Sequence, residues 1–127
     1  MRYLLDTHAA IWALEDINKL SRAAAAVVED TACLLFISIA SAWEIAIKIS
    51  IGKLDFAGGC ANFIAQMEQN GIIVLPITGK HLQGVETLPA IHRDPFDRLL
   101  IATAQSENLT IISADENFQK YNIRCVW

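Results

Sequence analysis

Short apolar segments alternate with helical segments along almost the whole chain, and this alternation constrains the fold more than any other feature of the sequence. The apolar segments have the length and composition of β-strands, and they cover Arg2–Leu5, Leu34–Ser38, Ile72–Leu75, Leu109–Ile112 and Ile123–Val126. The helical segments and turns cover Thr7–Leu14, Arg22–Glu29, Ala42–Ile51, Asn62–Gln69, Lys80–Val85, Pro95–Glu107 and Glu116–Tyr121. Strands separated by helices form parallel sheets that helices cover on both faces. The sequence therefore predicts an α/β domain with a central parallel sheet.

The composition is that of one folded domain over residues 1–127. Hydrophobic residues make up 54% of the chain and charged residues 19%, which excludes a disordered polypeptide. The most apolar stretch, Leu34–Ile51, contains Glu44 and Lys48, and each of these costs roughly 2–3 kcal/mol or more at a bilayer centre. A membrane span is therefore not expected. The three cysteines form no CxxC pair, so we expect reduced thiols in a cytoplasmic protein.

Acidic residues stand where the expected strands end. Asp6 directly follows the first strand, Glu44 lies near the start of the helix after the second, and Asp115 closely follows the fourth. Because the carboxyl ends of parallel strands share one edge of the sheet, where ligands bind, we expect these carboxylates to converge. Clustered carboxylates suit hard divalent cations such as Mg²⁺ or Mn²⁺.

Each of these acids also has a simpler interpretation as a helix cap. Asp6 and Asp115 stand in front of helical segments, and Asp94 is followed by a proline, as at many helix starts. Ser41 and Glu44 fit a capping box, in which the glutamate reaches back to the backbone N–H of the serine. Capping explains each acid singly as well as metal binding does. Taken together, carboxylates gathered at one edge repel one another unless a cation lies among them.

The expected helix at Ala42–Ile51 is apolar almost all round. The polar residues that share one of its faces are Ser41, Glu44 and Lys48. Glu44 either faces a polar site within a largely buried neighbourhood or forms an ordinary ion pair with Lys48, worth about 0.3–0.5 kcal/mol. A helix this apolar is buried on most sides or meets a partner. With Trp12 and Phe63 of neighbouring helices it exceeds what one small sheet covers, so we expect a homodimer.

Several stretches, in order over nearly the whole chain, resemble the motifs of PIN-domain nucleases, and specifically of VapC toxins from bacterial toxin–antitoxin pairs. They are YLLDTH (3–8), SAWEIAIK (41–48) with GKL (52–54), HRDPFDRLLIATA (92–104) and ISADENF (112–118). The resemblance implies a PIN-like three-layer α/β/α fold. It also implies a metal-dependent endoribonuclease that hydrolyses RNA with Mg²⁺ or Mn²⁺, leaves a 3′-hydroxyl and a 5′-phosphate, and pairs with a cognate VapB-type antitoxin.

The resemblance further implies an acidic site made of Asp6, Glu44, Asp97 and Asp115. Asp94 belongs to the same motif as Asp97 but is not the expected ligand. Thr7 and Ser113 are placed either to hydrogen-bond the site carboxylates or to act as plain capping hydroxyls. His8 and His92 lie near the site in the sequence. We read neither as a metal ligand, because oxygen-rich sites for hard cations do not need imidazole.

The charge of the chain limits how it can bind nucleic acid. With 10 basic and 14 acidic residues, the net charge of −4 offers no basic footprint and argues against a simple nucleic-acid-binding module. An enzyme that binds phosphate through a metal is compatible with this charge. Arg93 and Arg98 either contact RNA phosphates or are solvated arginines beside acids.

Two other classes of protein share some of these features. A phospho-receiver domain has a similar length, sheet and acidic Mg²⁺ cluster, but it needs an aspartate after a middle strand, and Leu34–Ser38 ends without one. A non-catalytic interaction module keeps the fold without the chemistry, and the complete acidic set argues against it. The complete acidic set is therefore consistent with the metal-dependent endoribonuclease that the resemblance implies.

Overall fold

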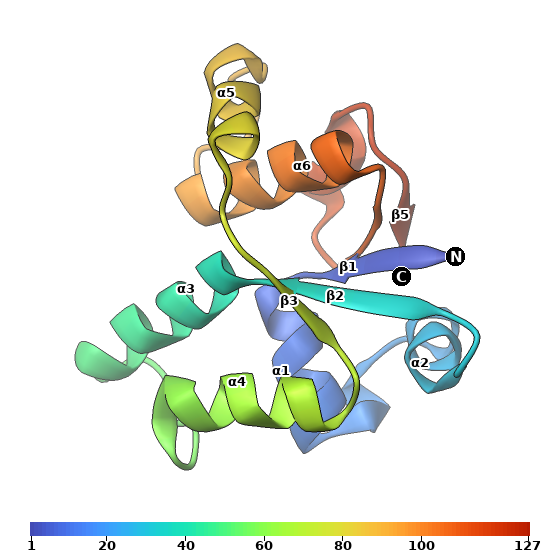
Figure 1. The fold of residues 1–127 in the computed structure, drawn as a ribbon, viewed down its shortest axis with the longest axis vertical. Coiled ribbons are helices and arrows are strands. Elements are labelled where there is room, and N and C mark those ends of the chain that lie inside the picture. The colour runs from blue at the N-terminus through green and yellow to red at the C-terminus, as the bar shows by residue number, and fades with distance from the viewer.

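The computed structural model describes residues 1–127 and contains one sheet of five parallel strands. The strands are β1 (Arg2–Leu5), β2 (Leu34–Ser38), β3 (Ile73–Leu75), β4 (Thr110–Ile112) and β5 (Cys125–Val126). They lie in the order β3-β2-β1-β4-β5 (Figure 1). The sheet grows from β1 to one side through β2 and β3 and to the other through β4 and β5, so the strand order reverses at β1. Ligands of open parallel sheets bind at the carboxyl edge of such a reversal.

Six α-helices surround the sheet, and they are α1 (Thr7–Glu15), α2 (Arg22–Glu29), α3 (Ile39–Ser50), α4 (Gly59–Gln69), α5 (Gly79–Thr87) and α6 (Pro95–Glu107). Two short 3₁₀ helices, η1 (Ile17–Lys19) and η2 (Glu116–Lys120), complete the secondary structure. Helices α1, α2 and α4 lie on one side of the sheet and α5 and α6 on the other, while α3 extends past the sheet from the end of β2 (Figure 1). This arrangement confirms the predicted three-layer α/β/α fold. None of the helices has the length and apolar composition of a membrane span.

Successive residues of the strands pack against opposite layers. Leu4 of β1 belongs to an apolar cluster with Phe36 of β2 and Leu100 of α6. Its neighbours Tyr3 and Leu5 belong to a second cluster, which includes residues of α1, α2, α3 and α4. Because helices cover both faces, most residues on both faces of the strands are hydrophobic, and hydrophobic and polar residues do not alternate. These continuous hydrophobic runs allowed the strands to be predicted from the sequence.

Helix α3 begins earlier than the sequence predicts. Its N-cap is Ser38, the last residue of β2, whose hydroxyl accepts a hydrogen bond from the backbone N–H of Ala40 at 3.1 Å. The predicted capping box of Ser41 and Glu44 is therefore wrong, because both residues lie inside the helix and both are buried. The strand runs into the helix without a loop, so the cap falls on the first serine rather than the second.

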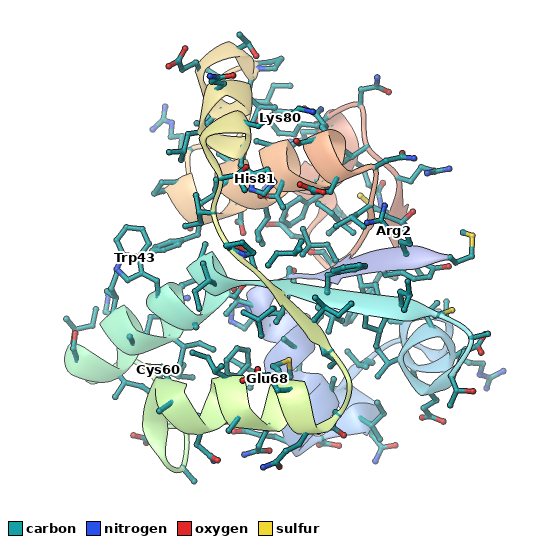
Figure 2. The ribbon with its side chains drawn as sticks, in the orientation of Figure 1. Arg2, Trp43, Cys60, Glu68, Lys80 and His81 are labelled. Atoms are coloured by element: carbon teal, nitrogen blue, oxygen red, sulfur yellow. The ribbon has the colours of Figure 1, made fainter.

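Helix α3 leaves a row of large apolar side chains exposed, whereas α4 does not. Phe63 of α4, which we expected to add to the surplus, is 1% exposed and packs edge-on against Phe56. Trp43 and Ile51 of α3 are each 58% exposed, and Ile47 between them is 36% exposed. The Trp43 side chain projects outward at the edge of the molecule (Figure 2). The predicted excess of apolar surface is therefore found on α3. The prediction was wrong about Phe63, because α4 directs that ring into the core.

Candidate functional site

Asp6 lies at the junction of β1 and α1, at the reversal of the sheet. Its backbone N–H donates to the carbonyl of Ile112 in β4, and its carboxylate accepts from the N–H of Ala9 at 2.8 Å, so it caps α1. Burial raises the pKa of Asp6, against the lowering effect of hydrogen bonds from Ser113 and Ala9. The negative charge of Asp115 raises the pKa further, although its effect is the smallest of the causes. Asp6 is thus both a helix cap and a buried acid beside other acids.

Glu44 joins α3 to α1 through one carboxylate oxygen and forms an ion pair within α3 through the other. The hydroxyl of Thr7 donates to Glu44 Oε1 at 2.7 Å, and Lys48 Nζ lies 2.8 Å from Oε2. The Thr7 and Ser41 hydroxyl oxygens are 2.9 Å apart, so the polar face of α3 points at the start of α1. Both interpretations of Glu44 hold at once: it forms the ion pair with Lys48, and it faces a buried polar site.

The two aspartates of the DPFD stretch have different surroundings. Asp94 is the N-cap of α6, and its carboxylate accepts from the backbone N–H groups of Phe96 at 2.8 Å and Asp97 at 3.1 Å. This confirms the predicted cap. The Asp97 carboxylate takes no part in capping, and its Oδ2 lies 2.9 Å from His92 Nε2.

The pKa of Asp97 is shifted by its burial and by neighbouring acids. Burial and the neighbouring Asp94 carboxylate raise the pKa of Asp97 to about 7, and only His92 acts to lower it. The carboxylates of Glu44 and Asp6 raise this pKa as well, although they come from α3 and from the end of β1. Acids that are distant in the sequence therefore repel one another in one place, and a cation there would relieve the repulsion.

His92 lies between Asp97 and Asp115, a placement that the sequence did not suggest. Its Nε2 is 2.9 Å from Asp97 Oδ2 and 3.4 Å from Asp115 Oδ2. Its Nδ1 accepts from the backbone N–H of Asp94 at 3.3 Å, so the hydrogen-bond network assigns the proton to Nε2, facing the two carboxylates. One ligand atom from each of His92, Asp97 and Asp115 lies within 4.8 Å of the others. This spacing allows one ion to contact Asp97 and Asp115, whereas His92, with its proton on Nε2, is a hydrogen-bond donor to these carboxylates.

The guanidinium of Arg98 binds backbone carbonyls of the segment that carries His92, and it does not contact the acids. Its guanidinium donates to the carbonyl oxygens of Pro89 at 3.0 Å, Leu88 at 3.2 Å and His92 at 3.3 Å. Neither of the roles we considered for Arg98, an RNA contact or a solvated charge, describes this environment. Arg93 is exposed.

The remaining polar residues of the edge contact the acids. Ser113, which follows β4, accepts from the backbone N–H of Asp115 at 3.0 Å and also hydrogen-bonds Asp6. Asp115 caps η2 by accepting from the N–H of Asn117 at 2.9 Å, which leaves its other oxygen facing His92. The structure thus brings all four expected acids to the carboxyl edge of the sheet, with Thr7 and Ser113 beside them.

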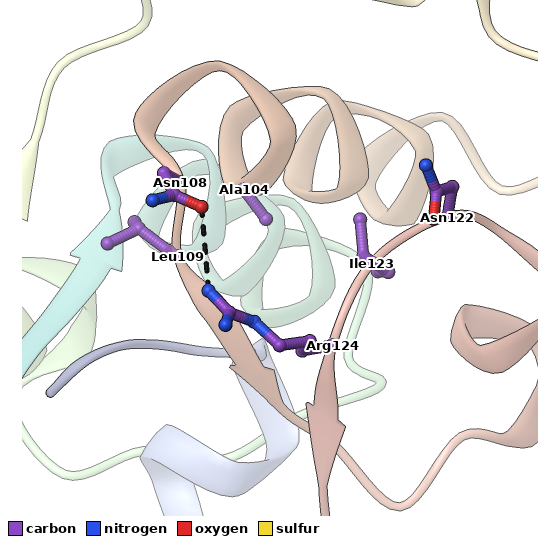
Figure 3. Close-up of a pocket in the computed structure, with 6 residues that line it drawn as sticks. All are labelled: Ala104, Asn108, Leu109, Asn122, Ile123 and Arg124. Atoms are coloured by element: carbon purple, nitrogen blue, oxygen red, sulfur yellow. Dashed lines mark hydrogen bonds between the residues drawn. The ribbon is translucent and has the colours of Figure 1, made fainter.

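Two pockets distinguish the edges of the sheet. One of about 320 Å³ opens beside the acids and is lined by Asp6, His8, Trp12, Ala114 and Asp115. A larger one of about 420 Å³ lies at the amino ends of β4 and β5, where Arg124 donates to Asn108 Oδ1 at 3.5 Å (Figure 3). The larger pocket has no carboxylate in its lining, whereas Asp6 and Asp115 line the smaller one.

Comparison with known proteins identifies the family. A model of the PIN domain matches residues 3–123. No curated protein matches the sequence. Similar solved structures include VapBC2 from Rickettsia felis bound to a DNA fragment from their promoter (17% identity, TM-score 0.72, covering 99% of this chain and 98% of that one).

Two further structures are similar over nearly their whole length. One is DNA-bound VapBC from Salmonella typhimurium (17% identity, TM-score 0.69, covering 99% of this chain and 97% of that one). The other is a toxin–antitoxin complex from Klebsiella pneumoniae (18% identity, TM-score 0.62, covering 98% and 96%). At these identities the structures establish the fold. Because the family model spans almost the entire sequence, the chain belongs to the PIN domain family.

Proposed function

We propose that the protein is a nuclease, and more specifically a metal-dependent endoribonuclease that acts as the toxin of a toxin–antitoxin pair. The observation that carries the proposal is the gathering of Asp6, Glu44, Asp97 and Asp115 at the carboxyl edge of the sheet. Burial raises the pKa of Asp97 to about 7, together with the negative charges of Asp94, Glu44 and Asp6. Ionised carboxylates this close together are unfavourable by themselves, and a bound cation would make their arrangement favourable. Residues 1–127 then act as one PIN domain.

The donor groups suit Mg²⁺ or Mn²⁺. The carboxylate oxygens of Asp97 and Asp115 already lie within 4.8 Å of one another, and Asp6 shares a pocket with Asp115. Carboxylate oxygens dominate the set, as hard divalent cations prefer. When bound, such an ion supplies positive charge for the scissile phosphate and lowers the pKa of an attacking water.

The protein's own residues then hold this site in shape. Thr7 fixes one oxygen of Glu44, and Ser113 links Asp6 to the backbone of Asp115. His92, held by its Nδ1 contact to the backbone of Asp94, presents Nε2–H to Asp97 and Asp115. These contacts limit the rotation of the carboxylates, which is how outer residues tune metal sites. The scissile RNA phosphate binds at this edge, and hydrolysis leaves a 3′-hydroxyl and a 5′-phosphate.

The exposed apolar face of α3 supports the proposed partners. Trp43, Ile47 and Ile51 form a continuous apolar surface that the monomer leaves uncovered. A homodimer covers part of it, and an antitoxin of the VapB type covers the rest and blocks the acids. One of the similar structures is itself a toxin–antitoxin complex. We place the protein in the cytoplasm, where its RNA substrate is.

Cleavage of RNA by the purified protein tests the proposal. Single-stranded RNA should be cut in the presence of Mg²⁺ or Mn²⁺, should stay intact in EDTA, and should be cut again when the ion is restored. The Asp97→Asn variant is the inactive control, and the Asp94→Asn variant, which removes a charge three residues away, should remain active. Cleavage by Asp97→Asn at the parent's rate would refute the assignment.

A further inference from the structure

Three aromatic side chains continue from the acids along the surface of α1. His8 and Trp12 are one helical turn apart, with ring centroids separated by 5.8 Å. The ring of Trp127, just after β5, lies 5.9 Å from that of Trp12 on a plane tilted by 52°. We refer to His8, Trp12 and Trp127 as the aromatic strip.

The aromatic strip lies at the margin of the core, against which Trp12 packs with part of its ring. The buried residues of α1 are Thr7, Ala9, Ala10 and Ile11, whereas His8 is exposed and Trp12 is only partly buried. No ring of the strip makes a hydrogen bond or ion pair with a site carboxylate. A large amphipathic ring at the surface, beside a polar site, is typical of a ligand contact.

Two rings of the strip share one pocket with the acids. Asp6 and Asp115 form one part of its lining, and His8 and Trp12 form another, around a volume of about 320 Å³. A ligand whose phosphate binds at Asp6 and Asp115 through a metal therefore has its next chemical group at the rings. The occupant must join an anionic group to a flat, uncharged one.

We propose that Trp12, with His8 beside it, stacks on an unpaired base of the RNA, next to the phosphate held at the acids. This inference rests on the proposed function and names what determines the choice of substrate. The net charge of −4 leaves the protein little attraction for the RNA backbone, so affinity has to come from elsewhere. Stacking on an aromatic ring supplies it without phosphate contacts.

Stacking also selects the form of the RNA. In a double helix the bases are already stacked on one another and are not available to a protein ring. An unpaired base in a loop or a single strand can turn out against Trp12. The strip therefore makes the enzyme selective for single-stranded segments.

A cationic side chain of a partner protein is the competing occupant, because acids and aromatic rings both attract it. The metal-loaded site disfavours that occupant, since the ion neutralises the carboxylates of Asp6 and Asp115. What remains in the pocket is the aromatic surface and a centre for phosphate. A nucleotide matches both, and an arginine side chain matches only the rings.

Calorimetric titration with two small ligands tests the inference without any cleavage. Adenosine 5′-monophosphate carries both phosphate and base, and ribose 5-phosphate lacks the base. In Mn²⁺ the parent protein should bind the nucleotide about 5- to 150-fold more tightly than the sugar phosphate. Trp12→Ala should bind the two equally, and Trp12→Phe should keep most of the preference. Trp43→Ala, which removes an exposed tryptophan that does not line the pocket, should behave as the parent does.

Three results would overturn the inference: equal binding of the two ligands by the parent, an undiminished preference in Trp12→Ala, and tighter binding of N-acetylarginine amide than of the nucleotide. The third would assign the pocket to a partner's cationic side chain. Melting curves verify that each variant is folded, and the comparison within the parent does not depend on any variant. Failure of the proposed function is separate, because it would appear as absent RNA cleavage by the parent.

Discussion

Asp97→Asn should make the metal-free protein more stable, although it removes a residue of the proposed active site. The pKa of Asp97 rises from 3.8 to about 7 in the fold, so its ionisation at pH 8 opposes folding. At about 1.36 kcal/mol per pKa unit the ceiling is about 4 kcal/mol. The side chain is 24% exposed, and solvent screening reduces the effect to about 2 kcal/mol. Asparagine keeps the shape without the charge, so the melting temperature should rise by roughly 5–10 °C.

Saturating Mg²⁺ should reverse the order of stability. A ligand at 100 times its dissociation constant stabilises the fold by about 2.7 kcal/mol, and the parent should gain accordingly. Asp97→Asn should gain little, because it lacks one carboxylate of the site. Melting curves of both proteins at pH 8, with EDTA and with Mg²⁺, measure the two effects.

Asp94→Asn is the matched control for charge. It also removes one negative charge near Asp97, but asparagine caps helices as well as aspartate does. It should keep the full Mg²⁺ shift, whereas Asp94→Ala should lose about 1 kcal/mol through the missing cap. If Asp97→Asn melts below the parent in EDTA, or shows the parent's Mg²⁺ shift, then Asp97 is only part of a helix start and the reasoning is refuted.

Three further predictions follow from the same contacts. Without metal, raising the pH from about 4 to about 7 should destabilise the protein, because the native state holds the Asp97 proton more tightly than the unfolded chain does. The raised pKa of Asp6 acts in the same direction. A melting temperature that rises across this pH range in EDTA would contradict this prediction. Thr7→Val should weaken Mn²⁺ binding about 10- to 100-fold in calorimetry by freeing Glu44, and parent-like affinity would show that the hydroxyl only packs. Trp43→Glu should turn the proposed homodimer into a monomer in light scattering, and a dimer that survives the substitution places the interface elsewhere.

The elements that the sequence predicted best carry their own start signals. Helix α2 begins after the cap Ser21 and α6 after Asp94, and both were predicted with the observed bounds. The strands β1 and β2 were also predicted with the observed bounds, because helices cover both their faces and all their residues except Arg2 and Ser38 are hydrophobic. The start of α3 was missed because Ser38 and Ser41 are equally good caps, and only the continuity of strand and helix decides between them.

For the site, too, the residues placed by local sequence patterns could be predicted, and those placed by tertiary contacts could not. The convergence of Asp6, Glu44 and Asp115 could be anticipated from the rule that parallel strands share a carboxyl edge. The position of His92 could not, because it depends on a loop that Arg98 and Tyr121 hold from elsewhere in the fold. Local patterns locate residues that end strands, whereas residues on irregular loops need the packed structure.

The chemical ends of the RNA fragments test the central claim most directly. Hydrolysis by a water that a metal at these carboxylates activates should leave a 5′-phosphate and a 3′-hydroxyl. It should also disappear in EDTA and in Asp97→Asn. Fragments that end in a 2′,3′-cyclic phosphate, or that form undiminished in EDTA, would mean that the 2′-hydroxyl is the nucleophile and that the acidic cluster is not the catalyst.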